Sequence, residues 1–164
     1  MATPRHIIVT GCNRGLGLEL VTKLVARGDQ VTATVRTLPL DPSNALAKLH
    51  AAQPTQLHLH TCDMTKGESI RAFAASMQHH AIQGLINNAG VLGDHQGIDD
   101  FDAEEAKRLY QVNALAPLQL SLALRAPLRK GGGKILHISS GLASIADNQT
   151  GGYLGYRMAK AALN

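Results

Sequence analysis

The chain alternates short apolar runs with longer stretches in which apolar residues recur at helical spacing. Five of the short runs predict β-strands, near residues 6–10, 30–35, 56–60, 84–87 and 134–139. Each run is brief and mostly apolar, as in strands of a sheet that is covered on both faces. Regular alternation of strands with helices favours stacked βαβ units around a parallel sheet. The pattern therefore predicts an α/β protein with a doubly wound parallel sheet.

The stretches between these runs predict helices over residues 16–27, 44–52, 67–80 and 102–128, and a last helix that starts near Tyr153. Loops are indicated at residues 41–43 and at the three glycines 131–133. Pro117 lies inside the long stretch 102–128, where proline removes a backbone donor and clashes with the preceding turn, so a kink or split is expected there. No internal repeat or low-complexity tract interrupts the pattern. We expect a single domain over residues 1–164.

Length and composition agree with one folded domain. The 164 residues are 45% hydrophobic and 17% charged, which is enough apolar material to build a core. The formal net charge of +4 is spread along the chain without a run of lysine or arginine, which argues against a nucleic-acid partner. Cys12 and Cys62 match neither a disulfide framework nor a CxxC metal motif, so we expect a reducing compartment.

Neither a leader nor a membrane span is indicated. Residues 1–5 lead directly into an apolar strand, and no apolar stretch approaches the roughly eighteen residues that a span needs. We therefore expect a cytoplasmic protein without membrane association. Histidines occur in pairs at His58 and His60 and at His79 and His80, but no third ligand has suitable spacing, so no metal site is expected.

A glycine-rich turn follows the first predicted strand and leads straight into the first predicted helix. Its sequence over residues 10–17 is TGCNRGLG, with glycine at Gly11, Gly15 and Gly17. A sharp strand-to-helix turn needs residues without a Cβ, both for unusual dihedral angles and for the approach of a pyrophosphate to the helix N-terminus. An ordinary tight turn is the alternative, but the position after the first strand favours a dinucleotide site. The spacing differs from GxGxxG and resembles the TGxxxGxG turn of the short-chain dehydrogenase/reductase superfamily.

The end of the second predicted strand indicates which nucleotide would bind. A carboxylate there would bond the free 2′-hydroxyl of NAD, whereas NADP needs positive charge near its 2′-phosphate. No carboxylate is present at this point; Arg36 follows the strand, and Arg14 lies in the glycine turn. Either arginine alone is compatible with a solvated surface charge. Together with the missing acid they favour NADP(H) as the cofactor.

Two further segments resemble the superfamily in the expected order. Asp63, after the third strand, resembles the residue that contacts adenine, and the NNAG sequence of residues 87–90 resembles a signature of the family. A helix cap and an ordinary turn are the alternatives for these residues. The resemblance implies a Rossmann-like sheet of strand order 3-2-1-4-5 with its last strands absent, and cofactor contacts from Gly11, Asn13, Arg14, Gly15, Leu16, Gly17, Arg36, Asp63, Asn88, Ala89, Gly90, Tyr156 and Lys160.

Candidate catalytic residues lie near the C-terminus. Tyr156 and Lys160 are four residues apart and share one face of a helix. An ammonium beside a phenol favours its ionised form, which suits proton exchange with a carbonyl oxygen or an alcohol. The resemblance implies that a serine after the fifth strand orients the substrate carbonyl. We choose Ser140 because the family's serine is usually the second of such a pair, with Ser139 and the more distant Ser144 as alternatives.

Tyr153 competes with Tyr156 for the role of the catalytic acid. Many family members have a shorter gap between the serine and the tyrosine, and a gap of that length would select Tyr153. However, Arg157 and not lysine lies four residues after Tyr153. We therefore assign catalysis to Tyr156, with a longer loop before it. The resemblance also implies a fourth catalytic residue, Asn113, which would hold a proton-relay water.

Within the superfamily, the glycine turn with its arginine and the segment 151–164 resemble sniffer-like and C-factor-like carbonyl reductases. This resemblance implies hydride transfer from the nicotinamide of NADPH to a carbonyl carbon. Tyr156 would protonate the oxygen, Lys160 would hold the ribose, and Ser140 would polarise the carbonyl. The expected partner is a small-molecule carbonyl or alcohol, and assembly into a homo-oligomer is left open.

Family members continue beyond the point that corresponds to Asn164, with two further strands and the loop that closes over the substrate. We therefore expect the fifth strand to form an exposed apolar edge. An alternative function follows from the same observation, namely a truncated, catalytically impaired chain that acts as a non-catalytic nucleotide-binding or interaction module. A pure nucleotide sensor is disfavoured, because it would need none of the candidate catalytic residues Asn113, Ser140, Tyr156 and Lys160.

Overall fold

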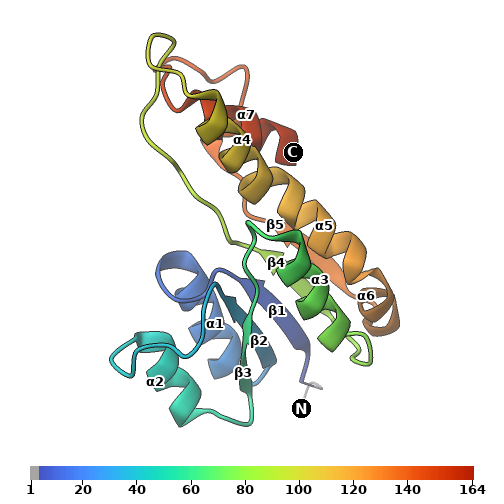
Figure 1. The fold of residues 1–164 in the computed structure, drawn as a ribbon. Helices are drawn as coiled ribbons and strands as arrows, with labels where there is room; N and C mark the ends of the chain where they lie inside the picture. The colour runs from blue at the N-terminus through green and yellow to red at the C-terminus, as the bar shows by residue number, and fades with distance from the viewer. Residues whose placement is uncertain (1–3) are drawn as a thin grey trace.

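The computed structural model describes residues 4–164 and has a parallel five-stranded sheet at its centre, in the order β3-β2-β1-β4-β5 (Figure 1). The strands are β1 (His6–Thr10), β2 (Gln30–Val35), β3 (Leu57–Thr61), β4 (Gly84–Asn87) and β5 (Lys134–His137). β1 pairs with β2 on one side and with β4 on the other, so the order reverses at β1. The predicted α/β fold and strand order are confirmed.

Two strands differ from their predicted bounds. β3 begins and ends one residue later than predicted, because its ladder with β2 runs from Leu57 to Thr61. β5 ends at His137, two residues earlier than predicted. The neighbouring strand β4 ends at Asn87, which faces His137. Residues 138 and 139 therefore have no facing strand with which to extend the ladder.

Helices cover both faces of the sheet (Figure 1). On one face, Val9 of β1 packs in a cluster with Leu46 of α2. On the other, Ile8 packs with Ile70 of α3 and Leu120 of α5. Because each face has its own core, the strands are apolar on both sides. The helices are α1 (Gly15–Ala26), α2 (Ala45–Ala52), α3 (Gly67–Ser76), α4 (Ala103–Tyr110), α5 (Ala116–Ala123), α6 (Arg125–Gly131) and α7 (Leu154–Leu163), together with a π-helical segment η1 (Gln111–Leu115) and a 3-10 turn η2 (Gly141–Ala143).

Helix α3 ends at Ser76 and not at the predicted residue 80. Its last turn tightens, because the Ser76 hydroxyl donates to the Phe73 carbonyl at 2.7 Å and the Met77 N–H bonds the Ala74 carbonyl at 3.1 Å. Residues 78–80 continue in three-residue turns, in which the Gln78 N–H bonds the Ala75 carbonyl at 3.3 Å and the His80 N–H bonds the Met77 carbonyl at 3.1 Å. The prediction of a longer helix was wrong for this reason. The bounds of α1 and α2 differ from the prediction by one residue at the ends.

The predicted helix 102–128 is interrupted first near Pro117. Proline has no N–H to donate to the carbonyl of Asn113, four residues earlier. The backbone before it widens into η1, in which the Ala116 N–H bonds the Gln111 carbonyl. The expected disturbance at Pro117 therefore takes the form of a π-helical segment. Such segments occur often at functional sites.

A second break, at Leu124, was not predicted. The backbone there leaves helical geometry, with ψ at 9°, and α6 begins at the next residue. Pro127 explains the break, since it cannot donate to the carbonyl of Ala123. That carbonyl accepts a hydrogen bond from Gln78 Nε2 instead, at 3.2 Å. The long stretch is therefore four segments, of which α6 extends to Gly131.

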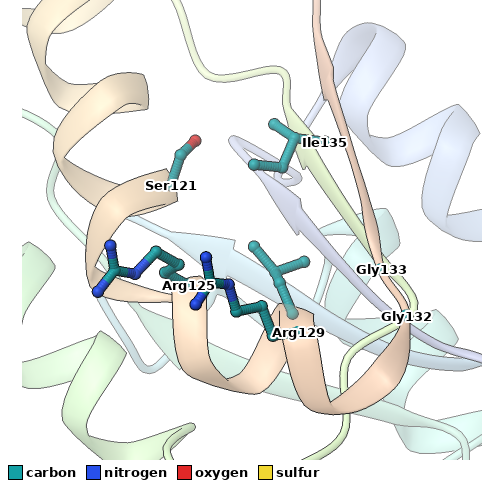
Figure 2. A pocket seen from close by; sticks show the side chains of 7 residues that line it. Ser121, Arg125, Arg129, Gly132, Gly133 and Ile135 are labelled. Carbon is teal, nitrogen blue, oxygen red and sulfur yellow. The ribbon is translucent and has the colours of Figure 1, made fainter.

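Strand β5 forms an edge of the sheet, as expected, and Ile135 and Leu136 expose 45% and 52% of their surface. Beside it lies a hollow of about 240 Å³ between α5, α6 and β5, with Arg125 and Arg129 on its rim (Figure 2). The hollow lies at the amino end of β5, next to Gly133. The candidate serine Ser140 follows the opposite end of the strand, so this hollow contains none of the predicted site residues.

No helix within residues 4–164 combines the length and the apolar character that crossing a membrane requires. Cys12 and Cys62 are free and buried. Burial raises the pKa of each thiol to about 12. Both side chains are therefore protonated at neutral pH, where a buried thiol acts as a small apolar group.

Four histidines, His6, His58, His60 and His80, line a cavity of about 400 Å³ on the α3 side of the sheet. The rings of His6 and His80 meet edge to face at 5.3 Å. Burial, followed by the charges of His80, His58 and His60, lowers the pKa of His6 from 6.5 to about 4. Burial, followed by the charges of His58 and His80, also lowers the pKa of His60. His6 and His60 are therefore neutral at neutral pH and resist protonation.

This cluster predicts that acid destabilises the fold. A group whose pKa is lower in the folded state contributes stability above its unfolded pKa, and loses it as the pH falls towards the folded value. His6 is only half buried, so we expect the loss between pH 6.5 and about 4 to be about 1–2 kcal/mol after solvent screening. Urea unfolding at several pH values measures it. His6→Gln, which keeps a partner for Thr32, should lose less unfolding free energy as the pH falls. An equal loss in that variant would contradict the prediction.

Candidate functional site

A groove of about 370 Å³ lies at the carboxyl ends of the strands, where ligands of doubly wound sheets bind. It is formed by the turns that follow β1, β2, β3 and β4, together with α4 and η1. Seven of the predicted cofactor-binding residues line it. The complete lining is Gly11, Asn13, Arg14, Val35, Arg36, Cys62, Asp63, Met64, Thr65, Ala89, Gly90, Val91, Arg108 and Val112.

Two glycines of the turn after β1 have distinct physical reasons to be glycine. Gly11 has φ +70°, and a Cβ there would lie 2.8 Å from Ala89 Cα, so the turn passes too close to the end of β4 for any side chain. Gly15 has φ +58°, with no other atom within 4 Å of where its Cβ would be. The backbone at Gly15 is therefore open to an approaching ligand.

Helix α1 presents unsatisfied donors at this point. Its N-cap residue is Arg14, whose side chain makes no capping hydrogen bond, and its first turn holds no acidic residue. The first N–H groups of a helix lack intrahelical partners and attract anions. Leu16, in the first turn, is 53% exposed. The arrangement suits a phosphate-bearing ligand.

Asn88 fastens the glycine turn to β4. Its Nδ2 donates to the carbonyls of Thr10 and Gly11 at 2.9 and 3.1 Å. In return, the Thr10 hydroxyl accepts the N–H groups of Asn88 and Ala89, each at 3.0 Å. Gly17 is buried against this junction, with the Asn88 amide 2.5 Å from where its Cβ would be. Asn88 and Gly17 therefore shape the turn and do not line the groove, and Thr10 is a contributor that the sequence analysis did not single out.

The far end of the groove holds charged side chains. Arg36 is exposed after β2, and neither it nor Arg14 belongs to an ion pair within residues 4–164. Asp63 accepts hydrogen bonds from the Thr65 N–H and hydroxyl at 3.0 and 2.8 Å. Desolvation tends to raise the pKa of Asp63, but the bonds from Thr65 and the charges of Lys66 and Arg36 outweigh it and lower the pKa. The carboxylate is therefore ionised, with free lone pairs.

Tyr156 and Lys160 lie together on α7, as predicted. Lys160 is 4% exposed, and its Nζ donates to the Ile138 carbonyl at 2.7 Å and lies 5.8 Å from the centre of the Tyr156 ring. Burial lowers the pKa of Lys160. A Cβ at Gly90 would be 3.7 Å from Nζ. The lysine is therefore at the Gly90 end of the groove, next to the strand that leads to Ser140.

Asn113 is fully buried in the π-helical segment η1. Its Oδ1 accepts the Val91 N–H at 2.9 Å, and its Nδ2 donates to the Val91 carbonyl at 2.8 Å. The side chain thus ties the turn after β4 to the helix layer, close to Gly90. Its side-chain amide is occupied by this pairing. A proton-relay water near Asn113 stays a prediction.

The two serines after β5 have different environments. Ser140 caps η2, and its hydroxyl accepts the Leu142 N–H at 3.2 Å. Ser139 donates to Oδ1 of Asn164 at 2.6 Å. Because η2 packs against α7, Ser140 lies in the segment next to the helix that bears Tyr156. Ser144 ends η2 and accepts the Asp147 N–H at 3.1 Å.

Arg108 in α4 also lines the groove and was not predicted. It pairs with Glu105, whose carboxylate accepts from Nε and Nη2 at 2.6 and 2.7 Å. An exposed helical arginine with a glutamate three residues earlier is an ordinary surface pattern, so the sequence carried no signal for it. Within residues 4–164, no group of three or more histidine, cysteine or acidic side chains is arranged to hold a metal ion.

Comparison with known proteins gives a consistent result. The family model described as short chain dehydrogenase matches residues 5–164. The C-signal protein of Myxococcus xanthus is 41% identical over 96 residues, which cover 58% of this chain and 58% of that protein. The chain spans about half the length of the curated relatives it matches.

Solved structures agree in fold. The NADPH-bound carbonyl reductase from chicken fatty liver is 35% identical, with a TM-score of 0.86 over 99% of this chain and 71% of that one. The carbonyl reductase Sniffer of D. melanogaster is 28% identical, with a TM-score of 0.87 over 98% of this chain and 71% of that one. Both structures extend beyond the part that this chain matches.

Proposed function

Because the chain belongs to the short-chain dehydrogenase family, we propose that it binds NADP(H) and transfers hydride between the nicotinamide and a small carbonyl or alcohol. The observation that carries the proposal is the shared location of two residue sets. The groove contains Gly11, Arg14, Arg36 and Asp63, and the buried Lys160 lies at its Gly90 end. A nucleotide groove that ends at a tyrosine–lysine pair suits reduction of a carbonyl.

The residues of the groove fit a dinucleotide phosphate. The open backbone at Gly15 and the uncapped start of α1 suit the pyrophosphate. Arg14 and Arg36 offer two cations for the 2′-phosphate, which distinguishes NADP from NAD. The ionised Asp63 suits the amino group of adenine. We also propose that the protein belongs with sniffer-like and C-factor-like reductases, on the basis of its glycine turn and residues 151–164.

The protein's own residues have separate roles in the proposed reaction. When bound, NADPH supplies the hydride that the carbonyl carbon receives. Tyr156 gives a proton to the carbonyl oxygen, and Ser140 donates a hydrogen bond that orients the same oxygen. Lys160, held by the Ile138 carbonyl at 2.7 Å, is within reach of both the groove and the Tyr156 ring. Asn113 keeps the turn after β4 in place beside it.

Thermal melting with nucleotides tests the proposal before any substrate is chosen. A ligand that binds only the native state raises the transition, by about 2.7 kcal/mol at a hundred times Kd, or roughly 5–10 °C for a chain of this size. We expect NADPH to raise it more than NADH, and we then expect NADPH oxidation with some members of a panel of aldehydes and ketones. A melting temperature that neither nucleotide raises would contradict the proposal and support a non-catalytic interaction module.

A further inference from the structure

The loop that precedes the catalytic helix is held by one buried cation, Arg157. The residue is 8% exposed, although it follows Tyr156 directly on α7. Its Nε donates to the Gly152 carbonyl at 3.0 Å, and its Nη2 donates to the Gly151 carbonyl at 3.1 Å. The side chain therefore folds back onto the residues just before its own helix.

The same guanidinium reaches the start of the loop. Nη1 donates to the Leu142 carbonyl at 3.4 Å, and Nη2 donates to the Thr150 hydroxyl at 3.2 Å. All four acceptors are neutral, and no ion pair within residues 4–164 includes Arg157. Burial of a cation is costly unless hydrogen bonds satisfy it, and only the flat five-donor guanidinium can satisfy acceptors in several directions. Arg157 thus joins both ends of the loop 142–152 to α7.

The residues that Arg157 holds have unusual backbone geometry. Gly151, Gly152 and Tyr153 have successive φ values of +62°, +65° and +50°. Among residues 4–164, Tyr153 alone has a positive φ without being glycine. A bulky residue in this region persists only where its surroundings hold it there, and such residues concentrate at functional sites.

A second contact holds Tyr153 from the opposite side. The ring of His95, in the loop after β4, meets the Tyr153 ring at 4.7 Å and 79°. A Cβ at Gly152 would collide with the same imidazole. The Leu154 N–H also bonds the Gln96 carbonyl, at 3.3 Å. The loops after β4 and before α7 are therefore locked together beside the candidate site.

We propose that Arg157 is a positioning residue for the reaction. With the His95–Tyr153 pair, it holds the loop 142–152 in one conformation, so that Ser140, just before the loop, and Tyr156, in the helix just after it, meet the substrate carbonyl in a fixed arrangement. This inference rests on the proposed function. Arg157 touches neither substrate nor cofactor in this role, and acts through the loop.

Arg157→Met and Arg157→Lys test the role, with Arg129→Met at the rim of the hollow in Figure 2 as the matched control. We expect Arg157→Met to lower kcat about 10- to 100-fold, because small displacements of reacting groups are costly. Turnover is counted per NADPH-binding site, so that unfolded protein does not contribute, and Kd for NADPH should change less than about twofold. Arg157→Lys, which keeps one donor group, should have a kcat between those of Arg157→Met and the unaltered protein, and Arg129→Met should keep full kcat.

Tyr153→Gly separates positioning from stability. Glycine adopts a positive φ without strain, and this gain offsets the lost ring contact, so we expect the melting temperature to change little. Loss of the ring contact with His95 should still lower kcat per site, by about fivefold or more. Turnover within about twofold of the unaltered protein in both Tyr153→Gly and Arg157→Met would overturn the proposal. The proposal would also be overturned if kcat in Arg157→Met fell only as far as its affinity for NADPH fell, while Tyr153→Gly kept full turnover.

Amide hydrogen exchange tests the loop without any turnover. We expect Arg157→Met to speed exchange about tenfold or more at residues 151–154 and to leave β1 and α1 unchanged. Unchanged exchange in that segment would overturn the proposal. This result differs from a failure of the proposed function. In that case the unaltered protein would show no NADPH-dependent turnover, while Arg157→Met would still speed exchange at residues 151–154.

Discussion

Tyr156→Phe should abolish most carbonyl reduction and leave NADPH binding intact. The substitution removes only the hydroxyl, and proton transfer by a positioned side chain contributes about 10²–10⁴-fold to such reactions. The ring remains 5.8 Å from Lys160 Nζ, and the bond from Nζ to the Ile138 carbonyl does not involve Tyr156. Steady-state turnover with a reactive aldehyde, together with fluorescence titration of NADPH, measures the two quantities.

Tyr110→Phe is the matched control, because Tyr110 lies on α4 with 42% of its surface exposed. It should keep full turnover. A Tyr156→Phe protein with unchanged kcat would remove Tyr156 from the mechanism. Attention would then turn to Tyr153, which has no lysine four residues later.

Arg36→Ala should weaken NADPH about 10- to 100-fold and NADH less than about twofold, since only NADPH carries the 2′-phosphate and hydrogen bonds between charged groups contribute about 1.5–3 kcal/mol. Arg36 and Asp63 both line the groove. The charge of Arg36 is among the effects that lower the pKa of Asp63 against desolvation, although the bonds from Thr65 and the charge of Lys66 contribute more. Thermal shifts with each nucleotide give the ratio of affinities.

Arg125→Ala, on the rim of the hollow beside β5, is the control for the loss of one positive charge. It should leave both affinities unchanged. Equal losses for NADPH and NADH in Arg36→Ala would place the 2′-phosphate elsewhere, with Arg14 as the remaining candidate. The salt dependence of NADPH binding should also become weaker in Arg36→Ala, because one screened ion pair is lost.

The turn after β1 was predictable from sequence because its requirements are local. A strand, a sharp change of direction and a helix start follow one another within eight residues, and glycine is the residue type that such geometry tolerates. The apolar runs likewise placed three strands with their observed bounds. Asn88 stays a predicted cofactor contact, and the sequence did not show that its amide joins the turn to β4, which only the pairing of β1 with β4 brings about.

Helix ends and breaks were less predictable. Pro117 drew attention, but its effect is the π-helical segment before it and not a simple kink. Pro127 was overlooked because a proline near the end of a helical stretch looks like an ordinary terminus, whereas here it splits α5 from α6. The form of the helix break at each proline depends on which donor bonds the carbonyl that the proline leaves free. For Ala123 this donor is Gln78.

By itself, the sequence determined the α/β class, the glycine turn, the absence of an acid after β2 and the helical spacing of Tyr156 with Lys160, because each depends on residue types at short separations. Tertiary structure alone decided that Asn113 pairs with Val91, that Arg157 reaches the Leu142 carbonyl at the far end of its loop, and that four histidines from β1, β3 and the turn after α3 share one cavity. These contacts join segments that the sheet order and helix packing bring together. No local pattern encodes them, because the identity of a partner depends on the path of the whole chain.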